Sequence, residues 1–391
     1  MSEPIYIECH PKKAQLPKQV FHTLEELAAF INSCPNVYDR KLFNADLSKL
    51  DLTCPKGREL LMQINAYTEH VIWPAEIAEQ MAQRLESGKN SGLGIRGIHQ
   101  KGYTGKGVNV AIVDHVLYVD HPEYKDNVVF YETGFMPSNT PKDEAWYHGA
   151  AVSSLLCGKN CGSAPDAHLF FWAHFCYNHE KGVHDARLQN PTLQKIIDWN
   201  NTHEEKDKIR CLSCSWGNLT DIAFEERQEL FKKVEESGCM VFGGCYGIRR
   251  GRRSVGGAKR DLYSDAADNL QGPDNLADWP PELAGTCLIV PRDQRTFASY
   301  MGGYMYDELG GASWTYPYLS GLVACGLQAF PSYTQQKDWQ DKIWQDLLST
   351  GTKDPRNYGA VTVNPVKFIE KMEYYRALEN KRLAEHFGKH K

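Results

Sequence analysis

The sequence predicts an α/β fold in which helices flank a doubly wound, mostly parallel sheet, with a mainly helical extension in front of it. Beyond residue 105, short and almost continuously apolar runs alternate with helix-periodic stretches, the pattern of parallel strands covered on both faces. The first 93 residues differ from this part of the chain and show mainly helical sequence patterns. Hydrophobic residues make up 42% of the 391 residues and charged residues 24%, a globular composition that excludes a disordered, collagen-like or coiled-coil chain.

Helix signals dominate the N-terminal extension. Thr23 and Glu26 form a capping-box pattern ahead of an apolar-periodic segment, which predicts a helix start. A helical pattern also runs from residue 58 to about residue 73. Pro74 then suits the first turn of a further helix that ends near Gly88.

The segment 87–94 is rich in Gly and Ser, which predicts a hinge. We therefore expect two domains, the extension over residues 1–93 and a larger domain over residues 94–391.

Five apolar runs after the hinge are predicted strands: residues 108–113, 167–173, 209–215, 239–244 and 286–290. Helix-periodic stretches lie between and behind them, at about 149–157, 189–200, 223–237, 313–329, 335–349 and 364–386. This alternation favours right-handed crossovers and a parallel sheet. The carboxyl ends of parallel strands meet at one edge, where ligands and catalytic groups gather.

Composition also bears on compartment and partners. The formal net charge of −5 argues against a general nucleic-acid binder. The sequence contains no run of about 18 apolar residues, so we expect no membrane-spanning helix. The first residues lack the charged start and apolar core of a secretory signal, so we expect a cytoplasmic protein. The 12 cysteines are then expected to be free thiols.

Two cysteine pairs are close in sequence, yet neither predicts a metal site. Cys211 and Cys214 lie three residues apart on a predicted strand, so they point to opposite faces. Cys157 and Cys161 have no second pair at zinc-finger spacing. We expect small buried thiols here and no metal ligands.

Asp114 directly follows the first predicted strand, in the segment GYTGKGVNVAIVDHVLYVDHPEY. An Asp after a strand is by itself typical of turns. The whole segment, with its TGKGV lead-in and the later His121-Pro122 pair, resembles the aspartate motif of the subtilisin-like serine proteases. The resemblance extends over about residues 95–375 and implies a subtilisin-like form of the predicted fold.

Two further motifs carry the same resemblance. His148 opens a predicted helix and is followed downstream by GSAPDAHLFFWA, as the catalytic histidine is in the family. The segment GGASWTYPYLSG fits the family's Gly-x-Ser-x-x-x-Pro-x-x-x-Gly pattern with Gly311, Ser313, Pro317 and Gly321. A serine at a helix start lies near unpaired N–H groups, and a proline is tolerated only in that first turn.

Asp114, His148 and Ser313 follow one another in the order of the subtilisin triad. The resemblance implies that Ser313 attacks the scissile carbonyl, that His148 accepts and returns its proton, and that Asp114 orients and stabilises the imidazole. This mechanism needs no metal and no cofactor. Structural calcium is common in the family, but no ligand set for it is identifiable in the sequence.

The resemblance also implies a substrate-binding edge. Ser215, Trp216 and Gly217 end the strand that in the family pairs with the substrate backbone, and Gly244 is a further expected contact. An extended peptide adds to such an edge through main-chain hydrogen bonds. The alternative is a buried strand end with a tryptophan for packing.

One departure from the family concerns the oxyanion. An Asn normally follows the strand that here reads CMVFGGCYG, whereas Tyr246 stands at the aligned position and no Asn occurs between Asn218 and Asn269. We expect the N–H group of Ser313 to donate, and the hydroxyl of Tyr246 and a nearby arginine are the candidates for the second donor. Losing one oxyanion donor costs about 10²–10³ in turnover.

A basic segment follows the altered loop. We hypothesise that Arg249 and Arg250 rim the cleft and favour acidic substrate segments, the alternative being a solvated loop.

The leading interpretation is thus a serine endopeptidase that processes a cytoplasmic peptide or protein. The alternative is a pseudo-protease that keeps the fold as a peptide-binding or regulatory module. The extension 1–93 suits a prosegment-like, substrate-recognition or dimerisation role, and the oligomeric state and cleavage preference stay open.

Overall fold

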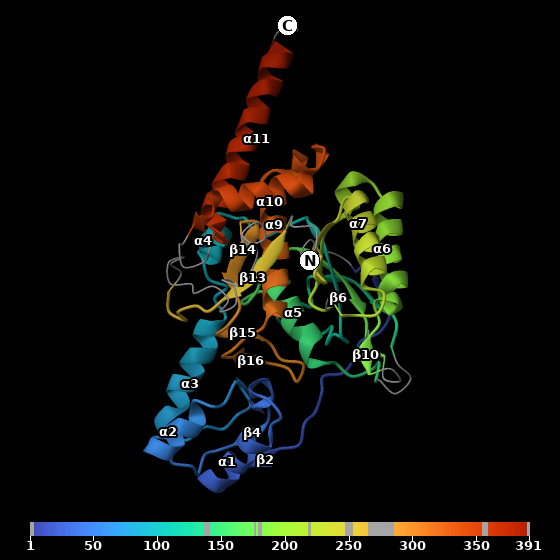
Figure 1. Ribbon diagram of the computed structural model, residues 1–391. Helices are drawn as coiled ribbons and strands as arrows, with labels where there is room; N and C mark the ends of the chain where they lie inside the picture. The colour runs from blue at the N-terminus through green and yellow to red at the C-terminus, as the bar shows by residue number, and fades with distance from the viewer. Residues whose placement is uncertain are drawn as a thin grey trace.

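The computed structural model describes residues 4–136, 141–175, 177–178, 182–217, 220–246, 253–264, 285–353 and 359–388. At its centre lies a six-stranded sheet in the order β1-β7-β8-β6-β11-β12, in which every neighbouring pair is parallel (Figure 1). Its strands are β1 (Tyr6–Ile7), β6 (Asn109–Asp114), β7 (Val128–Thr133), β8 (His168–Ala173), β11 (Ile209–Cys214) and β12 (Met240–Gly243). The predicted doubly wound, parallel α/β fold is confirmed.

Helices cover both faces of this sheet, and they are α5 (Tyr147–Cys157), α6 (Asn190–Thr202), α7 (Phe224–Glu236) and α9 (Thr315–Ala329) (Figure 1). Successive residues of β6 enter different cores, because side chains alternate across a strand. Val110 and Ile112 pack in the cluster that includes α5 and α9, whereas Ala111 and Val113 pack in the cluster that includes α6 and α7. This double burial explains the continuous apolar run of the strand.

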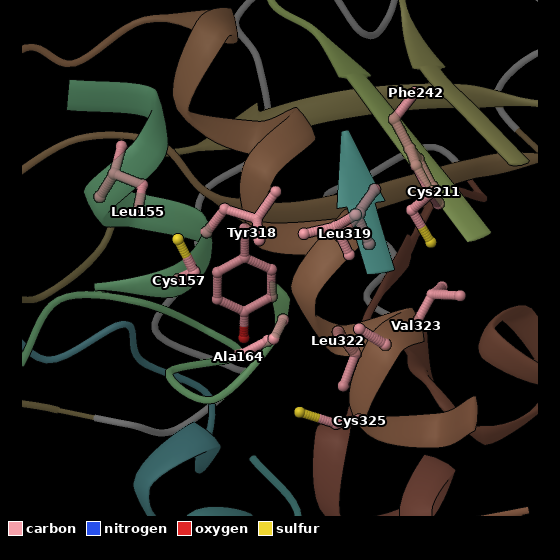
Figure 2. Packing of buried hydrophobic residues seen from close by; sticks show 14 of the residues in the cluster. Leu155, Cys157, Ala164, Cys211, Phe242, Tyr318, Leu319, Leu322, Val323 and Cys325 are labelled. Carbon is pink, nitrogen blue, oxygen red and sulfur yellow. The ribbon is translucent and has the colours of Figure 1, made fainter. Parts of the chain in front are cut away.

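Helix α9 is apolar on almost every side because it lies inside the larger core. Figure 2 shows its side chains between those of α5 and those of the sheet, with Leu319 and Leu322 fully buried. Burial of each such leucine stabilises the fold by about 1.5–3 kcal/mol. Gly321 allows a close approach to the neighbouring loop, because a Cβ there would lie 2.0 Å from Ser163 Oγ.

A second sheet lies apart from the main sheet. The predicted strand 286–290 is β14 (Cys287–Pro291), but it belongs to a separate sheet in the order β13-β14-β18-β17. Its partners are β13 (Ser254–Ala258), β17 (Thr352–Lys353) and β18 (Val361–Thr362). The other four predicted strands lie in the main sheet, together with β1 and β7, which the sequence patterns missed.

The extension combines helices with short strands: α1 (Leu24–Ser33), α2 (Pro55–Leu61), α3 (Ala75–Gly88), β2 (Gln19–Val20), β3 (Lys41–Leu42), β4 (Ala45–Asp46) and β5 (Ala66–Thr68). Thr23 caps α1 as predicted, its side chain accepting from the N–H of Glu26 at 3.2 Å. The helix predicted over 58–73 is wrong beyond residue 62, since β5 occupies part of that range.

Strand pairing joins the extension to the rest of the chain. β5 is an inner strand of the sheet β15-β16-β5-β3, in which it pairs with β16 (Tyr304–Asp307), and β16 pairs with β15 (Arg295–Ala298). β1 forms one edge of the main sheet. The extension also has a core of its own, including Leu27, Leu42 and Met81. The domain division at residue 93 stays a prediction.

The remaining described elements are α4 (Ile95–Gln100), α10 (Trp339–Thr350), α11 (Pro365–Gly388), β9 (Tyr177–Asn178) and β10 (Val183–His184). Helix α11 packs on α9 through its first turns, burying Phe368, Ile369 and Met372, and then extends away from the body at the end opposite α1 (Figure 1). No helix in the described part of the chain is both long and apolar enough to cross a bilayer.

All cysteines among the described residues are free, as predicted. Cys211 and Cys214 do point to opposite faces of β11, since they pack in different core clusters.

Candidate active site

Asp114 and His148 form a hydrogen-bonded pair at the carboxyl edge of the main sheet. Asp114 is the last residue of β6, and His148 is the second residue of α5. His148 Nδ1 lies 2.7 Å from Asp114 Oδ1. The carboxylate is buried, whereas about a fifth of the imidazole side chain, 22%, is exposed. One end of the pair is thus held by the core and the other reaches solvent.

Local packing explains why these two segments meet. The carbonyl of Asp114 accepts from the N–H of His174 at 2.6 Å, which fixes the end of β6 against the end of β8. Gly149 lets α5 approach the same strand end, because a Cβ there would lie 2.3 Å from the carbonyl oxygen of His115. A glycine next to His148 is therefore a geometric requirement of this contact.

The carboxyl group of Asp114 is held in its charged state. Burial alone would raise its pKa, but the charge and hydrogen bond of His148 and the N–H of His115 outweigh burial and lower the pKa. The N–H of His115 donates to Asp114 Oδ1 at 2.8 Å. A carboxylate that accepts the Nδ1 proton leaves Nε2 of His148 free to act as a base.

Ser313 lies in the 3₁₀ turn Ala312–Trp314 that leads into α9. The ring of the next residue, Trp314, stacks on the His148 ring with centroids 5.3 Å apart. The hydroxyl of Ser313 donates to the carbonyl of Ser215 at 3.2 Å rather than to His148. The structure therefore brings the Ser313 backbone beside the dyad, with the hydroxyl turned toward the strand end.

Ser215 and Ser313 hold each other through two hydrogen bonds. Besides the bond above, Ser215 Oγ donates to the carbonyl of Ser313 at 2.9 Å. The indole of Trp216 donates to the carbonyl of Val113 at 2.7 Å and lies against the guanidinium of Arg227. The tryptophan side chain thus anchors the segment, and any pairing with a peptide there depends on the backbone.

Gly217 and Gly244 lie close together beyond the two strand ends. The carbonyl of Gly217 accepts from Cys245 Sγ at 3.4 Å, and the N–H of Gly244 donates to the carbonyl of Cys214 at 3.2 Å. The carbonyl of Gly244 accepts from Gln228 at 3.0 Å. Their contact with a substrate stays a prediction.

The oxyanion role predicted for Tyr246 disagrees with its position. Its hydroxyl donates to Glu235 Oε2 at 3.1 Å, and its ring packs on Phe231. The side chain folds back along the sheet because the chain turns directly after the short strand β12, where the N–H of Tyr246 donates to the carbonyl of Gly243. The backbone N–H of Ser313 donates to no acceptor within the described residues. Arg249 and Arg250 lie outside the described residues.

Histidines and aromatic rings around His148 form a feature that the motif analysis missed. The His115 ring lies 5.8 Å from the His148 ring and contacts Trp146 and Phe175. His174 is buried, and neither of its ring nitrogens has a hydrogen-bond partner. Burial is the main cause that lowers the pKa of His115 to about 4 and that of His174 to about 3. Both imidazoles are therefore neutral near pH 7.

A positional signal for His174 does exist in the sequence. It directly follows β8, whose last residue Ala173 pairs with Asp114. Because catalytic groups gather at the carboxyl ends of parallel strands, His174 is a candidate site residue for the same reason as Asp114.

Comparison with known proteins places this geometry in context. The chain is similar to the serine protease AprX of Bacillus subtilis (strain 168), with 26% identity over 310 residues. The match covers 67% of this chain, and the chain spans 66% of the length of that relative. No protein-family model matches the sequence.

A solved structure shares the fold. The prenylagaramide maturation protease PagA superposes with a TM-score of 0.50 at 17% sequence identity, covering 71% of this chain and 98% of that one. At this identity the likeness shows the fold alone. Together with the similarity to AprX, this shared fold supports the resemblance to a divergent subtilisin-like protease that the three motifs indicate.

Proposed function

We propose that this protein is a serine endopeptidase in which Asp114, His148 and Ser313 form the catalytic triad. The observation that carries the proposal is the 2.7 Å hydrogen bond between His148 Nδ1 and a buried carboxylate. That bond sets the imidazole tautomer that a base needs. The neighbouring helix start carries a serine in the family's sequence frame, and the similarity to the serine protease AprX agrees with it.

Each residue has one task in this mechanism. Ser313 Oγ attacks the scissile carbonyl while His148 Nε2 takes its proton, and the imidazolium then returns that proton to the leaving amine. Asp114 keeps its negative charge throughout and stabilises the imidazolium. In this mechanism the Ser313 hydroxyl leaves the Ser215 carbonyl and turns toward His148.

Stabilisation of the oxyanion falls to the backbone N–H of Ser313. The hydroxyl of Tyr246 is hydrogen-bonded to Glu235, so we assign no side-chain donor to the role of the family's Asn. The corresponding loss is about 3–4 kcal/mol of transition-state stabilisation. We therefore propose a slow peptidase, which suits specific processing of one peptide or protein better than bulk digestion.

The substrate would be an extended peptide that pairs with the backbone of residues 215–217. A processing role inside the cell is part of the proposal, and the free thiols among the described residues favour it. PagA is a maturation protease, which is a precedent within the same fold. The paired strand β5 favours a permanent role for the extension over removal as a prosegment.

A peptide-binding module without catalysis is the second candidate. Two hydrogen bonds favour this alternative. The Ser313 hydroxyl is bonded to the Ser215 carbonyl, and the Tyr246 hydroxyl is bonded to Glu235. Both candidates use the same peptide-binding edge, so binding alone does not separate them.

Digestion of a peptide library separates them. We expect the wild-type protein to cleave library members and Ser313→Ala to lose activity by about 10⁶-fold, because the nucleophile is removed. Ser320→Ala is the matched control, since this serine lies on α9, directly after the turn that carries Ser313, and is fully buried, with no side-chain hydrogen bond to any described residue. Cleavage that survives in Ser313→Ala, or wild-type protein that binds peptides without cleaving them, would contradict the proposal.

A further inference from the structure

The dyad has a third polar neighbour that the triad mechanism does not use. Ligand atoms of Asp114, His115 and His148 all lie within 4.8 Å of one another. His115 directly follows Asp114 in the chain, so the same strand end positions both residues. Two imidazoles and one carboxylate therefore converge on one small volume at the mouth of the sheet.

Two of these groups have unused binding capacity. Asp114 Oδ2 is buried and has no hydrogen-bond partner among the described residues, although an unpaired buried carboxylate oxygen is costly. The ring nitrogens of His115 make no hydrogen bond with any described residue, because its ring packs between Trp146 and Phe175. A cation bound at this point would satisfy both groups.

The donor set suits one chemical class of ion. Imidazole nitrogen with a single carboxylate oxygen favours Zn²⁺ and similar transition metals over Ca²⁺ and Mg²⁺, which prefer oxygen ligands. Tetrahedral Zn²⁺ with ligands at 2.0–2.2 Å places neighbouring ligand atoms about 3.3 Å apart. The three ligand atoms lie within 4.8 Å of one another, so they move closer together when they bind the ion.

We propose that Asp114, His115 and His148 form a three-ligand site for Zn²⁺, and that the bound ion inhibits the peptidase. Three protein ligands leave a fourth position for water. A metal on His148 Nε2 takes the lone pair that accepts the proton of Ser313. A metal on Nδ1 instead takes the place of the proton that bonds to Asp114, and the neutral imidazole then carries its proton on Nε2. Either bond removes the general base.

Zinc binds neutral imidazole and ionised carboxylate, and these are the two kinds of ligand that the cluster offers. The negative charge of buried Asp114 offsets part of the charge of the ion. The site is open to solvent on the side of His148, which provides a route of entry.

Metal binding is measured directly, and only the inhibition rests on the proposed function. Titration of the full chain with Co²⁺ by absorption spectroscopy and with Zn²⁺ by calorimetry tests the site. Co²⁺ spectra separate imidazole and carboxylate coordination from coordination by the free thiols. We expect one such site in the wild-type protein and at least about 100-fold weaker binding in His115→Phe, which keeps the ring packing but loses the ligand.

His203→Phe is the matched control, because His203 is an exposed imidazole stacked on Trp199 at 3.7 Å, far from the site in the chain. We expect it to bind Zn²⁺ as the wild type does. His115→Gln is a second variant in case the phenylalanine variant does not fold. Fluorophosphonate labelling of each protein, with Zn²⁺ and with chelator, then reports inhibition as a ratio within that protein.

The outcomes separate the two proposals. Binding that depends on His115, together with labelling that Zn²⁺ suppresses in the wild type and not in His115→Phe, supports both. Binding that depends on His115 in a protein that is never labelled supports the metal site and rejects the peptidase. Absent binding, or equal binding in wild type and both His115 variants, overturns the metal site whether or not the protein is labelled.

Discussion

Asp114→Asn should lower the rate of peptide hydrolysis by about 10⁴-fold, the loss that the corresponding change causes in the best-studied Ser-His-Asp triad. The amide occupies the same volume but no longer accepts the Nδ1 proton in the same way, so His148 adopts the wrong tautomer. Asp114 is buried, and its oxygen lies 2.7 Å from His148 Nδ1. The measurement is kcat/KM on the best peptide from the library.

Asp120→Asn is the control for this substitution. Asp120 is exposed and pairs only with exposed His10 among the described residues, at 2.8 Å. Its replacement should leave kcat/KM within about twofold, since exposed ion pairs contribute about 0–1 kcal/mol. A loss below about tenfold in Asp114→Asn would mean that the buried carboxylate does not orient the base.

Arg227→Met lowers the free energy of unfolding by about 3–5 kcal/mol, because it removes the cation that pairs with the buried carboxylate of Asp221. The Arg227 side chain is fully buried, and Nη1 lies 2.7 Å from Asp221 Oδ2. Its guanidinium also contacts the rings of Trp216 and Phe224. Denaturant unfolding followed by fluorescence and circular dichroism measures the change.

Two controls identify the cause of that loss. Lys232→Met removes the cation of an exposed pair with Glu236 on the same helix and should cost less than about 0.5 kcal/mol. The double variant Arg227→Met with Asp221→Leu should recover much of the stability, since the buried carboxylate that lost this cation is removed as well. If the double variant is as unstable as the single one, lost packing rather than the buried charge explains the effect.

The fold was largely predictable because its signals are local. Four of five apolar runs lie in the main sheet, and the capping pattern at Thr23 marks the start of α1. The short strands of the extension were not predictable, because two or three residues have no period. Strand β5 exists through its pairing with β16, some 240 residues further along the chain.

The site was predictable where a motif specified it and not elsewhere. Asp114 and His148 meet as predicted, since a strand end and a helix start place them. The failure at Tyr246 has a tertiary cause, namely its contact with Glu235 after a tight turn. The cluster of His115 and His174 arises from neighbouring strands, and only the order of strands in the sheet brings them together.

The proposal that Ser313 is an activated nucleophile is tested most directly by fluorophosphonate labelling followed by mass-spectrometric mapping of the modified peptide. We expect a single adduct on Ser313 in the folded wild-type protein, no adduct in Ser313→Ala and much slower labelling in His148→Ala. Folded, metal-free wild-type protein that takes up no label, or an adduct on a different serine, would contradict the triad.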